Sequence, residues 1–353
     1  MNFASDNSGP AAPEILEAVI SANKGYQNSY GGDSLMEKVE NQLREIFEAP
    51  DAAIYLVATG TAANALSLAC LCPSWSTIFC HEHSHIQEDE CGAPEFFTGG
   101  SKLTTVGGKH AKIDPQQLAK AISSTGIIGV HNVQKGALSI TNATELGAVY
   151  DLDEIIGLTT MAKDFDLPVH MDGARFANAL VKLGCSPAEL SWKAGVDILS
   201  FGGTKNGLLG VEAVIIFDPS LAWEFELRRK RGGHLFSKHR FLSAQMKTYL
   251  KDDLWLQLAQ KANSAAAKLS RELAKQEKVT IEHPTDVNMV FPSLPREIHN
   301  LAFSKKAAYY LWPPNQSLEG NPKESLKARM VCNWSTTDEE IETFVNLVKP
   351  CQV

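Results

Sequence analysis

Two apolar runs in the middle of the chain end in polar motifs, placed where strands of a parallel sheet would finish. Residues 167–171 lead into Asp172-Gly173-Ala174-Arg175, and residues 196–201 lead into Gly202-Gly203-Thr204-Lys205-Asn206-Gly207. Short apolar runs bounded by turn residues are typical of strands that are buried on both faces. Because ligands of such sheets bind at the carboxyl ends of the strands, the sequence predicts a carboxylate and an amine, Asp172 and Lys205, at one ligand-binding edge.

The same alternation of apolar runs and helical patterns extends from about residue 50 to residue 217. Strands are expected at residues 54–58, 127–131, 167–171, 196–201 and 211–217, with helices up to residue 71 and over residues 151–165. This order predicts an α/β fold with a mainly parallel sheet. The last third has helical patterns over 223–251, 254–276 and 338–348 and short strand-like runs at 279–281, 288–291 and 330–332. It predicts a smaller α+β domain.

Composition excludes several classes of protein. The 353 residues are 44% hydrophobic and 21% charged, which is ordinary for a globular protein. A net charge of −8 and a pI near 5.7 argue against nucleic acid or an anionic membrane as the main partner. The seven cysteines are odd in number and include no C-x-x-C pair, which suits a reducing compartment. With no apolar run near the roughly 20 residues of a membrane span and no signal-peptide pattern in residues 1–6, we expect a cytoplasmic protein.

An amine and a carboxylate at neighbouring strand ends are the two groups that a pyridoxal phosphate (PLP) enzyme needs. The lysine holds the cofactor aldehyde as a Schiff base, and the carboxylate keeps the pyridine nitrogen protonated so that the ring accepts electrons. Upstream, Thr59-Gly60-Thr61-Ala62-Ala63-Asn64 lies between an expected strand and an expected helix. Backbone N–H groups and the helix dipole favour a phosphate at such a helix start, which predicts Gly60 and Thr61 as phosphate-binding residues.

With these motifs the chain resembles the low-specificity L-threonine aldolases, PLP-dependent lyases of the aspartate-aminotransferase-like superfamily. The likeness runs through nearly the whole chain, and its further landmarks are Ser5-Asp6, Ser29-Tyr30-Gly31-Gly32-Asp33, and His85 with Glu90-Cys91-Gly92-Ala93. The resemblance implies a PLP-binding large domain over residues 12–245 with a mainly parallel seven-stranded sheet. It also implies a small C-terminal domain over residues 246–353 and an N-terminal segment, residues 1–11, that lines the active site.

The resemblance also implies what the site residues do. Lys205 would carry the cofactor, Asp172 would face the pyridine nitrogen, and His85 would stack on the ring and assist proton transfer. The expected substrates are L-threonine, L-allo-threonine and related β-hydroxy-α-amino acids, cleaved to glycine and an aldehyde. Its carboxylate would be bound by Arg175, which also reaches the phenolic oxygen of the cofactor, and by Arg329 and Ser5.

Other implied features concern neighbouring subunits. The resemblance implies a homotetramer made of tight dimers, in which each active site is completed by a neighbour. Tyr30 matches a tyrosine at the edge of the active site, close to the subunit interface. Either Arg229 or Arg231 would reach the cofactor phosphate of a neighbouring subunit. Both belong to a basic tract that could instead suggest nucleic-acid binding, which the acidic net charge disfavours.

The chain departs from the family pattern near the expected position of the β-hydroxyl group. Asn142 stands in a segment where several members carry a second histidine, and Asp89 replaces an aromatic residue. The proton acceptor and the preference between threonine and allo-threonine therefore stay open, with His131 as a possible substitute base.

Three alternatives remain at this stage. The first is another reaction on the same scaffold, such as β-elimination, racemisation or decarboxylation. The second is a nucleotide-binding module that uses the Gly60 turn, although this turn lacks the G-x-G-x-x-G spacing. The third is a metal site built from His81, His83 and His85, which would share one face if they lay on one strand; we favour no metal.

Overall fold

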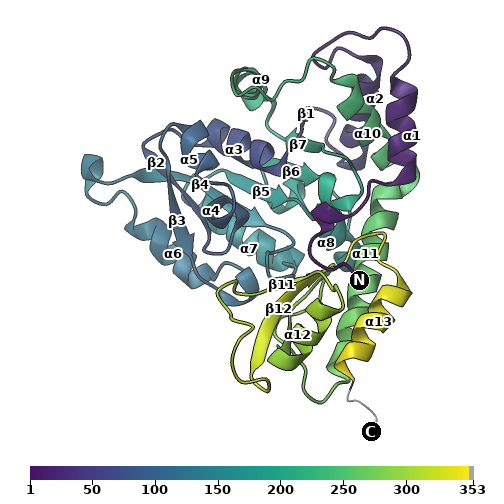
Figure 1. Ribbon diagram of the computed structural model, residues 1–353. Coiled ribbons are helices and arrows are strands. Elements are labelled where there is room, and N and C mark those ends of the chain that lie inside the picture. Colours follow the sequence, from purple (N-terminus) through teal and green to yellow (C-terminus); the bar gives the residue numbers. More distant parts are fainter. Residues whose placement is uncertain (350–353) are drawn as a thin grey trace.

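A seven-stranded sheet forms the centre of the computed structural model, which describes residues 1–349 (Figure 1). The strands follow the order β1-β7-β6-β5-β4-β2-β3, and β7 alone runs antiparallel to its neighbours. They are β1 (Ala53–Val57), β2 (Ser76–His81), β3 (Lys102–Val106), β4 (Gln134–Thr141), β5 (Val169–Gly173), β6 (Ile198–Gly202) and β7 (Glu212–Ile216). The predicted mainly parallel seven-stranded sheet is thereby confirmed.

Helices cover both faces of this sheet, and the alternation of side chains along each strand explains why. In β1, Tyr55 and Val57 pack with α3, whereas Ile54 and Leu56 join the larger core on the opposite face. The helices in this part of the chain are α1 (Pro13–Ala22), α2 (Ser34–Ile46), α3 (Gly60–Leu71), α4 (His85–Glu88), α5 (Ala93–Thr98), α6 (Pro115–Ser124), α7 (Leu152–Lys163), α8 (Phe176–Leu183), α9 (Ala222–Arg231) and α10 (Arg240–Leu250). By the same alternation Asp172 faces α3, since Met171 beside it belongs to the larger core.

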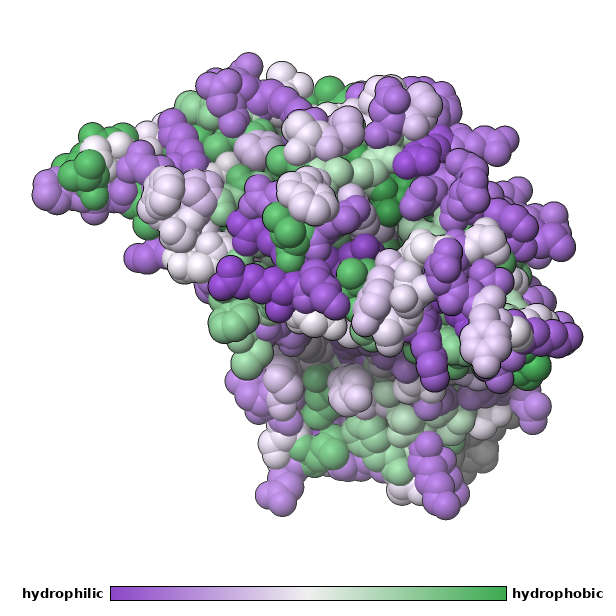
Figure 2. Space-filling model, turned by 90° about the horizontal axis from the view of Figure 1, so that it is seen from above, coloured by the Kyte–Doolittle hydropathy of each residue, from purple (hydrophilic) through white to green (hydrophobic). Residues whose placement is uncertain are grey.

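Two secondary-structure predictions are wrong. Residues 127–131 are not a strand but part of a loop that extends from the body of the molecule between α6 and β4 (Figure 1). Its apolar side chains are exposed and gather at the protruding tip (Figure 2), so the run is apolar without being buried. The expected helix over 223–251 is two helices, α9 and α10, because Gly232 and Gly233 follow α9 and the second adopts a left-handed φ of 78°.

A second, smaller sheet lies in the last third of the chain. Its strands are β8 (Thr280–Ile281), β9 (Met289–Val290), β10 (Pro292–Pro295), β11 (Tyr310–Leu311) and β12 (Ser325–Val331), and its helices are α11 (Leu254–Ala274), α12 (Arg296–Ser304) and α13 (Asp338–Val348). These elements enclose a separate apolar core. A small α+β unit is therefore present, while the division at residue 245, which falls inside α10, stays a prediction.

The N-terminal segment connects this smaller sheet to the larger one. Phe3 lies in the small core, its N–H donates to the carbonyl of Ala308, and its carbonyl accepts from the N–H of Val331. The next residues turn away from the small sheet, and the 3₁₀ turn Asp6–Ser8 contacts the turn that carries Lys205. None of the helices within residues 1–349 is long and apolar enough to cross a membrane.

Candidate active site

A cavity of about 240 Å³ opens at the carboxyl ends of β5 and β6. Its lining brings together five residues that the sequence predicted from separate motifs, namely Gly60, Thr61, His85, Asp172 and Lys205. The other lining residues are Asn7, Ala58, Thr59, Asn64, Ala174, Thr204 and Glu212. The strand-end argument therefore placed the amine and the carboxylate at the same site.

Lys205 occupies a tight 3₁₀ turn, Thr204–Asn206, immediately after β6. The turn is held on both sides: Asn206 donates to the hydroxyl of Tyr249 at 2.7 Å and to the carbonyl of Trp255 at 2.8 Å. The carboxylate of Glu212 accepts the N–H of Gly203 at 2.6 Å. Burial raises the pKa of Glu212 to about 7, against the opposing hydrogen bonds of the turn and the charge of Lys205. The lysine is thus presented by a backbone with little freedom.

Asp172 lies near the end of β5 as a buried carboxylate, and each of its oxygens accepts a hydrogen bond. One oxygen accepts the N–H of Ala174 and the other accepts the side-chain amide of Asn64, both at 2.9 Å. Burial by itself would raise the pKa of Asp172, but the charges of His85 and Lys205 and the hydrogen bond from Ala174 outweigh it, so the pKa is lowered. The group is an anion aimed at the cavity, as a partner of a protonated ring nitrogen must be.

His85 begins α4 and lines the same cavity. Its Nδ1 lies 2.8 Å from Oε1 of Glu90. The hydrogen bond to Glu90 is the main reason why the pKa of His85 is raised above its usual value, and burial opposes it. His81 ends β2 and His83 lies in the following turn, so the three histidines do not share a strand face. Across residues 1–349 the histidine, cysteine and acidic side chains form no cluster of three or more that could hold a metal ion.

The start of α3 has the features of an anion site. Thr59 is the N-cap residue, and its hydroxyl accepts the N–H of Ala62, which leaves the first N–H groups of the helix to a ligand. A Cβ added at Gly60 would meet no atom within 4 Å, so this glycine borders open space in the cavity. The position agrees with the phosphate-binding role predicted for Gly60 and Thr61.

Arg175 is not free in the cavity but is paired with Asp6 of the N-terminal segment. Nε and Nη2 of the arginine donate to the two carboxylate oxygens at 2.8 and 3.0 Å, and both side chains are at most 2% exposed. Asn288, just before β9, also donates to Asp6 at 3.0 Å. Arg329 on β12 is close enough for the charge of Arg175, after burial, to lower its pKa. Ser5 caps the turn that begins with Asp6.

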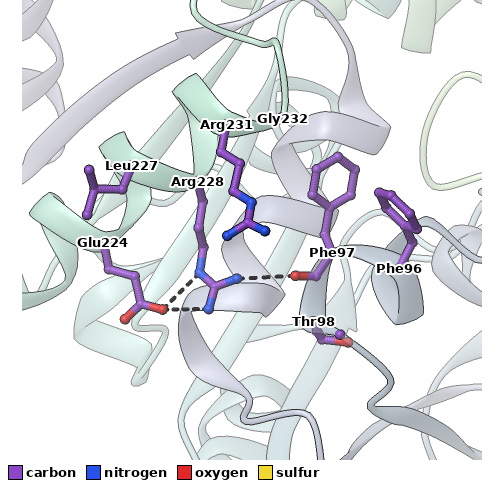
Figure 3. A pocket seen from close by; sticks show the side chains of 9 residues that line it. Phe96, Phe97, Thr98, Glu224, Leu227, Arg228, Arg231 and Gly232 are labelled. Atoms are coloured by element: carbon purple, nitrogen blue, oxygen red, sulfur yellow. Dashed lines mark hydrogen bonds and ion pairs between the residues drawn. The ribbon is translucent and has the colours of Figure 1, made fainter.

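The residues expected to serve a neighbouring subunit lie outside this cavity. Arg231 is exposed and reaches into a separate cleft of about 660 Å³ between α5 and α9, beside Phe97 (Figure 3). Arg229 is buried over the ring of Tyr55, at 4.8 Å from its centroid. Tyr30 is half exposed and has Lys230 above its ring.

The departures from the family pattern have different surroundings. Asn142 is buried, and its side chain clamps the backbone of Tyr150 by accepting its N–H at 3.2 Å and donating to its carbonyl at 3.4 Å. It therefore has a structural task in this chain. Asp89 is exposed, and His131 lies in the protruding loop rather than in the cavity of its own subunit.

Sequence reasoning missed four buried polar residues around the site: Asp6, Asn64, Glu90 and Glu212. The first three stand inside the landmark motifs, so a signal for them was available. Glu212 lies at the start of an apolar strand and carries no pattern that separates it from an ordinary polar strand end.

Known proteins resemble this chain over almost its full length. A family model described as "Beta-eliminating lyase" matches residues 2–295. Low specificity L-threonine aldolases from Pseudomonas aeruginosa and from a Pseudomonas species are 39% and 38% identical to it, covering 98% and 96% of this chain and 96% and 94% of their own. A solved threonine aldolase structure from Leishmania major superposes with a TM-score of 0.90 at 26% identity, covering 98% of both chains.

Proposed function

The chain belongs to the beta-eliminating lyase family, and on that premise we propose that it is a PLP-dependent aldehyde-lyase. The reaction is the cleavage of L-threonine, L-allo-threonine and related β-hydroxy-α-amino acids to glycine and an aldehyde. The observation that supports it best is the single cavity in which Lys205, Asp172 and His85 meet the N-terminus of α3. The names of its relatives give the substrate class.

The residues present fit PLP. The amine of Lys205 would hold the aldehyde, the anionic Asp172 would face the pyridine nitrogen, and the N–H groups at Gly60 and Thr61 would bind the phosphate. The buried carboxylate and the glycine that faces open space are the structural observations behind this assignment. When bound, PLP supplies an electron-withdrawing ring that stabilises the charge left on a carbon after bond cleavage.

The protein itself binds and orients the substrate. Arg329 on β12 would make the bidentate contact with the substrate carboxylate. Arg175 would add its charge close by, and only its Nη1 is left for the substrate, because Nε and Nη2 are paired with Asp6. Ser5 adjoins them through Asp6. His85 would accept the proton of the β-hydroxyl group, directly or through water. Lys205 would donate a proton to Cα and release glycine.

We also propose a cytoplasmic homotetramer whose active sites lie at subunit interfaces. Arg231 is exposed and is thus available to a neighbouring subunit, whereas Arg229 is buried with an Nε that has no hydrogen-bond partner within residues 1–349. Tyr30, exposed beside the same helix, would lie at this interface. The family and the exposure of Arg231 and Tyr30 support this interface.

The test is an assay of the purified protein with L-threonine for acetaldehyde and glycine. We expect both products in equal amounts, a visible absorption band from the lysine-bound cofactor, and loss of band and turnover in Lys205→Ala. Lys193→Ala, which removes a surface lysine paired with Glu48, is the control and should keep both. Pyruvate and ammonia from serine, or a D-amino acid, in place of glycine would favour the β-eliminating or racemase alternative. Borohydride trapping that labels another lysine would refute the role of Lys205.

A further inference from the structure

The polar side chains behind His85 form a chain of hydrogen bonds that leads to Asp172. We propose that Glu90 is a positioning residue that keeps the Nδ1 proton of His85 directed into the protein, so that Nε2 faces the cavity and accepts the β-hydroxyl proton. This inference rests on the proposed function and adds Glu90, with Asn64, to its machinery.

Glu90 occupies a buried position, where a charged carboxylate lowers the stability of the fold. Its side chain is 0% exposed, and burial of a charged group is unfavourable unless it is paired and hydrogen-bonded. Oε1 accepts from Nδ1 of His85 at 2.8 Å and from Nδ2 of Asn64 at 2.9 Å. Oε2 has no hydrogen-bond partner within residues 1–349. The bond to His85 is therefore one of two interactions that hold this carboxylate in place.

The hydrogen-bond arrangement fixes which atom carries the proton. Nδ2 of Asn64 has two hydrogens, and it gives one to Glu90 and the other to Oδ2 of Asp172 at 2.9 Å. Glu90 is thereby engaged as an acceptor, so Nδ1 of His85 is the donor. In the neutral ring Nε2 then holds the lone pair, which is the form that a proton acceptor needs.

The net effect of the surroundings of His85 is to raise its pKa, although burial opposes this. Glu90, Asp172 and Glu145, the last from the loop after β4, raise the pKa of His85, and Lys205 opposes them from the turn after β6. The pKa of His85 is raised as a result, chiefly by the hydrogen bond to Glu90. A higher pKa makes the neutral ring a stronger base.

The proton step balances within the proposed reaction. The O–H bond of the substrate breaks as an Nε2–H bond forms on His85, and the freed electron pair becomes the second bond of the aldehyde carbonyl. The Cα–Cβ electron pair stays with the glycine carbon, which takes up one proton. One proton is therefore lost by the hydroxyl and one is gained by Cα.

The chain contains a matched control for this pair. His83 and Glu88 have the same five-residue spacing and an Nδ1–Oε1 distance of 3.0 Å, but their side chains are 42% and 36% exposed. Solvent weakens such a pair. Glu88→Gln therefore removes a similar charge from a neighbouring histidine without touching the buried chain.

The kinetic test compares the pH dependence of kcat for the wild type, Glu90→Gln and Glu88→Gln. An opposite charge at this distance shifts a pKa by about 1–3 units. In Glu90→Gln the low-pH limb of the kcat profile should therefore shift to lower pH by about one unit or more. The plateau should also fall by roughly tenfold, because a weaker base transfers the proton more slowly, while KM changes little. Glu88→Gln should follow the wild type. A lower plateau with an unmoved limb would indicate a merely structural role and overturn the proposal.

A second measurement does not depend on turnover. Nitrogen-15 NMR of cofactor-free protein labelled in histidine, with His85→Phe to identify the signal, reports the pKa and the tautomer of His85. We expect neutral His85 to carry its proton on Nδ1, and a lower pKa in Glu90→Gln. A proton on Nε2 would overturn the proposal, even if Glu90→Gln failed to fold. A protein that shows the expected NMR signals but no glycine would instead contradict the proposed function.

Discussion

Replacing Asp6 by Asn will destabilise the protein far more than a typical substitution near a chain terminus. Asp6 and Arg175 form a two-point ion pair whose side chains are 1% and 2% exposed. Removing one partner of a buried pair leaves the other charge unpaired, which costs about 3–5 kcal/mol. Because Asn keeps one oxygen for Arg175, we expect a loss near the lower limit, roughly 3 kcal/mol.

The effect will depend on pH in a defined direction. Burial acts to raise the pKa of Asp6, but the charges of Arg175 and Lys205 and the hydrogen bonds from Arg175 and Asn288 outweigh it, so the pKa in the folded state is lowered. A lowered carboxyl pKa contributes stability above the unfolded value of about 4, and this contribution is lost as the pH falls through the folded value. The difference between wild type and variant should be full at pH 7 and shrink below about pH 4.

Urea unfolding followed by circular dichroism at fixed protein concentration measures the loss, with the exposed Asp51→Asn as the control. Arg175→Met and the double variant Asp6→Asn/Arg175→Met complete a thermodynamic cycle. The double variant should be more stable than the sum of the single losses predicts, by roughly 2–3 kcal/mol. Single losses that simply add, or a loss below about 1 kcal/mol, would refute the reasoning.

Two further predictions concern groups close to the Lys205 turn. Since burial raises the pKa of Glu212 to about 7, ionisation of this group favours the unfolded state once the pH exceeds the unfolded value of about 4.3. Thermal unfolding should show Glu212→Gln more stable than wild type by about 3–4 kcal/mol at pH 8 and equal to it at about pH 4 or below. Equal stability at both pH values would contradict this. A Cβ at Gly202 would overlap the carbonyl oxygen of Ala174, so Gly202→Ala should lower the free energy of unfolding by about 1–3 kcal/mol. Gly157→Ala is the control, because Gly157 lies inside α7 and an added Cβ there has no atom within 4 Å. In the same assay it should raise the free energy of unfolding by about 0.5–1 kcal/mol.

The sequence predicted the parts of the fold that local pattern determines. The apolar runs before Asp172 and Lys205 are strands β5 and β6, and the helix expected over residues 338–348 is α13. The rule that ligands bind at the carboxyl ends of parallel strands placed both residues at one cavity. Local pattern failed at residues 127–131, because an apolar run shows that a segment is hydrophobic but not that another element buries it.

The buried polar pairs could not be predicted, because their partners are far apart in the chain. Asn64 and Asp172 are 108 residues apart, and Asp6 and Arg175 are 169 apart. A hydrogen bond between such residues depends on how the sheet, α3 and the N-terminal segment pack together. No window of sequence contains that information.

These pairs nevertheless follow one physical rule. A buried carboxylate is unfavourable in a core, yet this fold keeps several at or behind the cavity wall, among them Asp6, Asp172 and Glu90. Each accepts a hydrogen bond from a residue that the proposed reaction needs or from one that leads to it: Arg175 for Asp6, Asn64 for Asp172, His85 for Glu90. A core built for stability alone would use apolar side chains at such positions. Their presence here is best explained if the orientation and charge of Arg175 and His85 matter more to this protein than the stability that these carboxylates cost.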